Sequence, residues 1–320
     1  MLFLHIKEKE SSVFMCTAVS LTADKHHFFA RTLDLEYHYK ESITLTPRRY
    51  PFSFTDGTAC REHPALLGMA YVVDGYPLYY DAMNEHGLCM AGLAFVHCCT
   101  YAKDEVSAAG HRIAPWELIP HTLTQCRTVE DARAWLSDMV LIDRPFSEEL
   151  SNQPMHWMIA DCTTSVVLET DRNGRIIIYD NPAGVMTNAP TFPDHMTNLS
   201  KYADLSPHPN MVNGICQRGM GAWGLPGDWS SPSRFIRASF LRCHMQIDDT
   251  VSVFSLLDTV KVPRGVSLSE NGQPIVTVYS AVMEPQRFCY HNRWECDTAP
   301  QMYAPSALQM RGTECIALSQ

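Results

Sequence analysis

The sequence predicts an α+β fold in which antiparallel sheets and helices are segregated along the chain. Short apolar runs rich in β-branched residues recur throughout, and turn signals such as Asn173-Gly174 separate many of them. Helical patterns occur in two groups instead of alternating with every strand. Hairpins therefore outnumber strand–helix–strand crossovers, and antiparallel pairing is favoured.

Each element follows from its local pattern. Strands at 15–20 and 28–34 flank a turn signal at 22–25 and predict a hairpin. A helix over 128–139 opens with Thr128 as its cap and two acidic residues. A turn is expected at 81–87 and a loop at 37–41. The other predicted helices are 114–125, 233–246 and 251–260. The other predicted strands are 43–47, 67–73, 88–96, 155–161, 165–170, 175–180, 273–283 and 287–291.

The composition indicates a globular chain of 320 residues, with 46% apolar residues to build a sizeable core. A net charge of -10 without any basic run argues against a nucleic-acid partner. No apolar stretch reaches the roughly 18 residues that a membrane helix needs, so no membrane partner is expected.

The N-terminal segment, residues 1–15, lacks the apolar core and cleavage site of a signal peptide. We interpret it as a short propeptide or an over-called start, and residues 16–320 as a single domain. Without a signal peptide, the protein is expected to be cytoplasmic.

The twelve cysteines do not indicate a disulfide framework or a metal site. They are scattered, no C-x-x-C pair occurs, and a reducing cytosol keeps such thiols free. His97-Cys98-Cys99 is the nearest approach to a zinc ligand set, but the paired spacing is missing. Residues 219–224 match G-x-G-x-x-G, yet Leu225-Pro226 follows and would break the helix that a dinucleotide site requires. We therefore expect no metal and no cofactor.

Cys16, Arg31 and Asp34 form the first candidate site. The predicted hairpin returns the end of its second strand to the start of its first, so a thiol, a guanidinium and a carboxylate come close together. A nearby cation favours the reactive thiolate. If Met15 is removed, the α-amino group of Cys16, with an ordinary pKa of about 7.7–8.0, can serve as the base. The alternative is that Cys16 is a small buried strand residue.

Two further residues stand in turn or helix-start positions. Asn188 lies in a turn-like stretch before Pro190, where its amide could face a developing oxyanion, although a plain turn asparagine is the alternative. Arg234 falls in the first turn of a predicted helix, where a cation opposes the helix dipole. Such a placement indicates a carboxylate partner or a functional role for Arg234.

Several stretches together resemble the choloylglycine hydrolase family, which comprises bile salt hydrolases and penicillin V acylases and belongs to the N-terminal-nucleophile hydrolases. The resemblance implies a four-layer αββα sandwich with two stacked antiparallel sheets, and amide hydrolysis through an acyl-enzyme on Cys16. It also implies a homotetramer. The stretches that carry it are 15–17, 30–37, 83–88 with 91–93, 156–161, 184–192 and 224–237.

The resemblance assigns roles residue by residue. Arg31 would lie beside the thiol, Asp34 would orient the α-amino group, Asn188 would supply the oxyanion amide, and Arg234 would support the centre. The implied substrate contacts are Leu33, Tyr37, Phe146 and Leu150.

One position departs from the family pattern. After Ala91-Gly92-Leu93 the bile salt hydrolases usually carry asparagine and the penicillin V acylases an aromatic residue, whereas this chain has Ala94. Its backbone N–H remains available as an oxyanion donor.

The predicted function is therefore hydrolysis of glycine- or taurine-conjugated bile salts, with a small-molecule substrate as the partner. The alternatives are an acylase for penicillin V or acyl-homoserine lactones, or a non-catalytic binding protein on the same fold.

Overall fold

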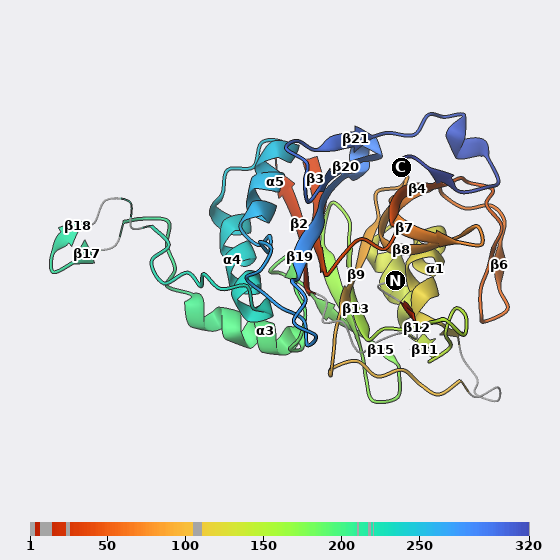
Figure 1. Cartoon of the computed structure of the whole chain (residues 1–320), viewed down its shortest axis with the longest axis horizontal. Helices are drawn as coiled ribbons and strands as arrows, with labels where there is room; N and C mark the ends of the chain where they lie inside the picture. Colours follow the sequence, from red (N-terminus) through yellow and green to blue (C-terminus); the bar gives the residue numbers. More distant parts are fainter. Residues whose placement is uncertain are drawn as a thin grey trace.

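Two antiparallel sheets lie at the centre of the computed structural model, which describes residues 4–6, 15–23, 26–104, 111–209, 211–216, 219 and 221–319 (Figure 1). One sheet has six strands and the other has eight. The six strands, in sheet order, are β16 (Val185–Met186), β2 (Met15–Ala23), β3 (His26–Leu35), β19 (Val276–Glu284), β20 (Cys289–Trp294) and β21 (Gln301–Tyr303). The eight are β15 (Ile176–Asp180), β14 (Ser165–Thr170), β13 (Met155–Ala160), β9 (Cys89–Ala94), β8 (Tyr76–Asn84), β7 (Leu66–Val73), β4 (Ser42–Thr46) and β22 (Ile316–Ala317).

Helices cover the outer face of each sheet, so the predicted four layers are confirmed. The helices α4 (Ser231–His244) and α5 (Thr250–Asp258) pack on β2, β3 and β19, with α3 (Phe192–Leu199) against α4 (Figure 1). On the other side α1 (Leu118–Gln125) packs on β8 and β9, and α2 (Val129–Leu136) on α1. Strands β2 and β9 contact each other between the layers.

Short elements complete the described chain. They are the strand pairs β1 (Leu4–Ile6) with β12 (Leu150–Asn152), β5 (Phe52–Ser53) with β6 (Ala59–Cys60), β10 (Arg112–Ile113) with β11 (Val140–Leu141) and β17 (Met211–Val212) with β18 (Ile215–Cys216), and the 3₁₀ turns Pro115–Glu117, Ser200–Tyr202, Pro285–Arg287 and Gln309–Arg311. No helix in these described ranges is both long enough and apolar enough to cross a membrane.

The core fills the space between the sheets and beneath the helices. Strands β8, β9 and β13 are buried almost throughout, because one face meets the opposite sheet and the other meets helices or further strands. Trp157, Phe29 and Phe235 are among the largest fully buried side chains. This dense packing excludes water from whatever polar groups lie inside it.

The predicted N-terminal hairpin is confirmed. Strands β2 and β3 pair antiparallel, with Cys16 opposite Leu33 and Met15 opposite Asp34. Residues 24 and 25, at the tip of the predicted turn, lie outside the described residues. The start of β2 and the end of β3 thus meet at one end of the six-stranded sheet.

The loop before α4 is held by side-chain caps. Ser230 accepts a hydrogen bond from the Ser233 backbone N–H at the helix start, and the Asp228 carboxylate accepts from the Ser230 N–H and the Ser233 hydroxyl. These caps fix the first turn of α4, from which Arg234 projects. Residues 221–224 form turns well before α4 begins, so the G-x-G-x-x-G pattern opens no helix there; Met220 lies outside the described residues.

Two local predictions were wrong, and one helix was missed. Asp81 belongs to β8, because the turn expected over 81–87 begins only after Asn84. The strand expected at 287–291 starts at Cys289, after a 3₁₀ turn. Helix α3 was not predicted, although Pro193 near its first position and Asp194 in its first turn are helix-start signals.

Gly68 lets β7 approach β8 closely beside Asp81. A Cβ at Gly68 would lie 2.1 Å from the Asp81 carbonyl oxygen and 2.5 Å from the Ala82 Cα. Any larger residue would push the two strands apart, so Gly68 helps to fix the position of Asp81.

Candidate active site

The Cys16 thiol is buried and contacts a guanidinium. Arg31 Nη2 donates to Cys16 Sγ at 3.3 Å, and neither residue is exposed to solvent. Burial raises the pKa of the thiol, while the positive charges of Arg31 and Arg234 oppose that rise. The sequence-predicted pairing of thiol and cation is thus present, in a buried site.

Cys126, another buried cysteine, differs from Cys16 in this respect. Burial raises the pKa of Cys126 to about 12, and the nearby negative charge of Asp131 adds to the rise. A thiol in that setting stays protonated and unreactive. The guanidinium on the sulfur therefore distinguishes Cys16 from Cys126.

Asp34 supplies a carboxylate with one oxygen unused. Its Oδ1 accepts a hydrogen bond of 2.5 Å from Thr277 Oγ1, whereas its buried Oδ2 has no hydrogen-bond partner among the residues that the structure describes. Burial raises the pKa of Asp34 to about 6, against the opposing effects of Arg234 and Thr277. Because Met15 pairs with Asp34 across the hairpin, the carboxylate faces the start of β2 with an acceptor to spare.

Asn188 joins three parts of the site. Its Oδ1 accepts from the backbone N–H of Cys16 at 2.8 Å and from Arg234 Nη2 at 2.8 Å. Its Nδ2 donates to the Ala94 carbonyl at 2.9 Å. Two donors on the oxygen fix the orientation of the amide, and the nitrogen carries a second hydrogen that can serve a ligand.

The backbone of Asn188 is also held. Its N–H donates to Ser231 Oγ at 2.9 Å, and its carbonyl lies 2.8 Å from His195 Nε2. The turn that carries Asn188 is thereby tied to the starts of α3 and α4.

Arg234 connects α4 with the nucleophile strand. Its Nη1 donates to the Cys16 carbonyl and to Thr17 Oγ1, and its Nε donates to the Trp229 carbonyl at 3.0 Å. The buried charge of Arg234 interacts with that of Asp34, which favours the charged form of each. Arg234 therefore has the carboxylate neighbour that its unfavourable helix position indicated, although its hydrogen bonds go to other groups.

The predicted pocket residues lie in different settings. Leu33 is fully buried opposite Cys16 in the hairpin. Tyr37 is 57% exposed just beyond β3. Phe146 packs against Trp116, and its N–H donates to the Leu150 carbonyl. Within the described residues, the structure gathers Cys16, Arg31, Asp34, Ala94, Asn188 and Arg234, and a backbone hydrogen bond joins Phe146 to Leu150.

Sequence reasoning missed several residues that hold this site. Asp81 lies 3.4 Å from Arg31 Nη1, and Thr277, Ser231 and His195 hold Asp34 or Asn188. An acid inside the apolar run Leu78-Tyr79-Tyr80-Asp81-Ala82-Met83 was the one signal that could have identified Asp81.

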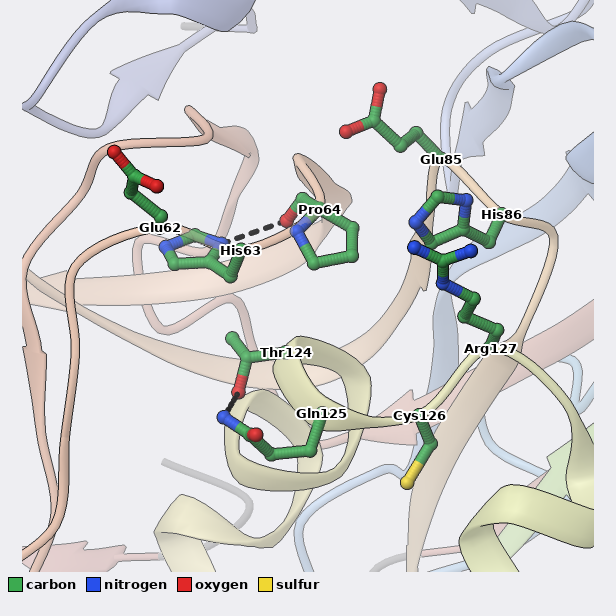
Figure 2. Close-up of a pocket in the computed structure, with 9 residues that line it drawn as sticks. All are labelled: Glu62, His63, Pro64, Glu85, His86, Thr124, Gln125, Cys126 and Arg127. Carbon is green, nitrogen blue, oxygen red and sulfur yellow. Dashed lines mark hydrogen bonds between the residues drawn. The ribbon is translucent and has the colours of Figure 1, made fainter.

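A separate polar cavity of about 380 Å³ lies beside the turn after β8 (Figure 2). Figure 2 shows Arg127 and His86 among the lining residues, and His63 Nδ1 hydrogen-bonds the Pro64 carbonyl. Its lining residues are Glu62, His63, Pro64, Glu85, His86, Thr124, Gln125, Cys126 and Arg127. None of these belongs to the group around Cys16.

Comparison with known proteins defines the class. The sequence profile of "Linear amide C-N hydrolases, choloylglycine hydrolase family" matches residues 16–315. The chain therefore belongs to this family of amide hydrolases.

Individual relatives share most of their length with this chain. The "Bile salt hydrolase/transferase" of Lactiplantibacillus plantarum is 38% identical over 291 residues, which is 87% of this chain and 89% of the relative. The "Conjugated bile acid hydrolase" of Lactobacillus gasseri is 30% identical, over 90% of this chain and 95% of the relative. A crystal structure of a mutant conjugated bile acid hydrolase from Clostridium perfringens matches with a TM-score of 0.88 at 29% identity, over 95% of this chain and 97% of that one.

Replacing Asp34 by asparagine should stabilise the chain that retains residues 1–15, mainly above acidic pH. Since the pKa of Asp34 is raised from 3.8 to about 6, the unfolded chain ionises first as the pH rises. Above about pH 6 the folded state carries the whole cost of the buried charge, about 3 kcal/mol. We expect Asp34→Asn to gain up to that amount at pH 8 in urea denaturation, and only about 0.5 kcal/mol at pH 4.

Asp228→Asn provides a control of opposite sign. Hydrogen bonds from Ser230 and Ser233 lower the pKa of Asp228 to about 2, so its charge stabilises the fold at pH 8. That variant should be less stable than the parent at pH 8. An advantage of Asp34→Asn that is equal at pH 4 and pH 8 would contradict the titration of Asp34 as its cause.

Proposed function

We propose that this protein is a cysteine amidase that hydrolyses the amide bond of glycine- or taurine-conjugated bile salts. The observation that carries the proposal is the contact of Arg31 with the Cys16 thiol inside a buried network. Membership of the amide hydrolase family supplies the reaction class. Two relatives described above supply the substrate class, since they are named bile salt hydrolase/transferase and conjugated bile acid hydrolase.

The reaction needs a base beside the thiol, and the proposed base is the α-amino group of Cys16. In the chain with Met15 attached, the Cys16 nitrogen is an amide and donates to Asn188. Cleavage between Met15 and Cys16 turns it into an amine near the unused Asp34 oxygen. Asp34 then accepts from this amine and orients it toward the thiol.

Catalysis proceeds in two halves. The amine takes the thiol proton and the thiolate attacks the substrate carbonyl, so a carbon–sulfur bond forms and the carbonyl oxygen becomes an oxyanion. Asn188 Nδ2 and the Ala94 backbone N–H stabilise this oxyanion. As the intermediate collapses, the carbon–nitrogen bond breaks and the protonated amine gives its proton to glycine or taurine. Water then hydrolyses the thioester and regenerates the thiol.

The arginines have separate tasks in this scheme. Arg31 stabilises the thiolate, because a nearby cation favours the charged form of a cysteine. Arg234 holds Asn188 and the Cys16 carbonyl in place through its two terminal nitrogens. Leu33, Tyr37, Phe146 and Leu150 are proposed to contact the acyl part of the substrate. None of these steps uses a metal or cofactor.

The proposed mature protein is a single domain over residues 16–320. The family profile begins its match at Cys16, which supports removal of residues 1–15. The N-terminal segment lacks signal-peptide features, which supports a cytoplasmic location. The family resemblance supports a homotetramer, with the conjugated bile salt as its small-molecule partner.

Conjugated bile salts should be cleaved by the purified protein, and Cys16→Ser should lose at least about 10³-fold in kcat. The hydroxyl is far less acidic than the thiol, although the change is one atom. Release of glycine from glycocholate and taurine from taurocholate is measured, with penicillin V as a third substrate. Cys126→Ser is the matched control, since Cys126 is also buried but has no role in the scheme. Preference for penicillin V would favour the acylase alternative, and activity retained in Cys16→Ser would refute the nucleophile.

Active protein should begin at Cys16. A nitrogen in a peptide bond cannot act as the base, so processing must precede activity. Intact-mass analysis of the active fraction determines the first residue. Full activity in molecules that retain residues 1–15 would exclude the proposed base.

Ala94→Asn should change KM more than kcat. The backbone N–H is kept in both proteins, so the oxyanion donor is unchanged, and the new side chain adds a contact that acts mainly on binding. Steady-state kinetics on glycocholate give both constants. Losing an oxyanion donor costs about 10²–10³ in kcat. A hundredfold rise in kcat for Ala94→Asn would therefore mean that the side chain belongs to the oxyanion hole.

A further inference from the structure

A second buried carboxylate, Asp81, stands behind Arg31. Arg31 comes from β3 of the six-stranded sheet and Asp81 from β8 of the eight-stranded sheet, and both are fully buried. Asp81 Oδ2 lies 3.4 Å from Arg31 Nη1, while Nη2 of the same guanidinium contacts Cys16 Sγ at 3.3 Å. The two ends of one planar group thus face a carboxylate and the candidate nucleophile.

Two tyrosines hold the Asp81 carboxylate from the opposite sheet. The Tyr279 hydroxyl donates to Oδ2 at 2.7 Å, and the Tyr290 hydroxyl donates to Oδ1 at 2.8 Å. Both rings are fully buried, on β19 and β20. The Tyr279 ring centre also lies 5.7 Å from Arg31 Cζ, within the range of a cation–π contact.

The contacts of Asp81 fit an ionised carboxylate. Its partners, the hydroxyls of Tyr279 and Tyr290, Arg31 Nη1 and the Met69 N–H, can each act as a donor. An ionised carboxylate accepts at all of its lone pairs, whereas a protonated one must itself donate. Each oxygen of Asp81 is therefore held by one tyrosine, and Oδ2 is held in reach of Arg31.

The remaining contacts of Arg31 do not fix the guanidinium as firmly. Nη1 also reaches the carbonyls of Tyr80 at 3.1 Å and Gly92 at 3.4 Å, and Nε reaches that of Thr32 at 3.3 Å. These bonds are no longer than the 3.4 Å contact with Asp81, but their acceptors are neutral. A charged acceptor forms stronger bonds than a neutral one, so Asp81 is the principal anchor of this end of the group.

We propose that Asp81, Tyr279 and Tyr290 are positioning residues that hold the Arg31 guanidinium against the Cys16 sulfur. Since they act through Arg31, they touch neither the thiol nor the substrate. This inference rests on the proposed role of Cys16 as the nucleophile. The hydrogen bonds of Asp81 with Tyr279 and Tyr290, which link the two sheets behind the site, would then affect the reaction rate.

The test compares Asp81→Asn, Tyr279→Phe and Tyr290→Phe in the processed protein. If the guanidinium is released from the sulfur, the thiolate loses its cation and its apparent pKa rises, by about one pH unit. We expect kcat to fall between about 10- and 100-fold with KM unchanged, because small misplacements near the reacting atoms have effects of that order. The two measurements are the pH profile of kcat/KM on glycocholate, and the pH profile of iodoacetamide alkylation at Cys16, followed by peptide mass spectrometry.

The direction of the shift discriminates between roles. If Asp81 acted only through its charge, removing that charge in Asp81→Asn would stabilise the nearby thiolate and lower the midpoint of the alkylation profile. If the group were merely structural, the variants would lose stability and keep the wild-type midpoint. Either result would overturn the proposal, and a raised midpoint would support it.

Tyr79→Phe is the matched control. Tyr79 is a fully buried tyrosine in the same strand as Asp81, and its hydroxyl bonds Thr46 on β4 at 2.7 Å. Loss of the Tyr79 hydroxyl should lower the free energy of unfolding without changing kcat or the midpoint of the alkylation profile. If Asp81→Asn fails to fold, Tyr290→Phe, which removes a single oxygen, still tests the proposal.

Failure of the proposed substrate would be recognised separately. Alkylation forms a carbon–sulfur bond and releases iodide, and it needs no bile salt. A protein inactive on glycocholate whose alkylation midpoint still rises in Tyr290→Phe would refute the substrate and retain the positioning role.

Discussion

The burial of two arginines is the physical constraint on which the centre of this protein depends. A guanidinium without water must find acceptors for its N–H groups, since an unpaired buried charge is very costly. Arg31 meets this demand with carbonyls of the opposite sheet, Asp81 and the Cys16 sulfur. Arg234 meets it with the Cys16 carbonyl, Thr17 and Asn188. Satisfying the two cations therefore brings β2, β3, β8 and the Asn188 turn into one fixed arrangement.

In the same arrangement, one oxygen of the Asp34 carboxylate lacks a hydrogen-bond partner among the described residues. Asp34 is buried with Thr277 on one oxygen and, within the described part of the chain, no hydrogen-bond partner on the other, while the Cys16 nitrogen is still an amide. A buried polar atom without a partner carries the full cost of its desolvation. An amine produced at Cys16 would supply that partner. Under the proposed mechanism, the free-energy cost of burying the Asp34 carboxylate is offset only when cleavage after Met15 creates the Cys16 amine. Processing would therefore change the electrostatic energy of Asp34.

The two sheets contribute differently to the site. The hairpin of the six-stranded sheet carries Cys16, Arg31 and Asp34, so the groups closest to the chemistry lie on paired neighbouring strands. The eight-stranded sheet supplies Asp81 and the Ala94 carbonyl, which contact those groups from behind or beside. Displacement of one sheet against the other would change the contacts that Arg31 and Asn188 make with the eight-stranded sheet, while the hairpin itself stayed the same. The dense packing between the layers makes such displacement costly.

The sequence by itself determined the strands of the hairpin, most helix positions, and the association of Cys16, Arg31 and Asp34. These depend on residues a few positions apart or on antiparallel pairing across one turn, which alternation and capping patterns record. Turn and helix-start positions singled out Asn188 and Arg234, and the resemblance of several motifs to one family assigned their roles. Only the tertiary structure decided that Asn188 bonds a backbone N–H 172 positions away, that Asp81 lies in a strand with Tyr279 and Tyr290 on its oxygens, and that one Asp34 oxygen stays unpaired. Those features depend on how two sheets stack and where side chains point between them, which no local pattern along the chain encodes.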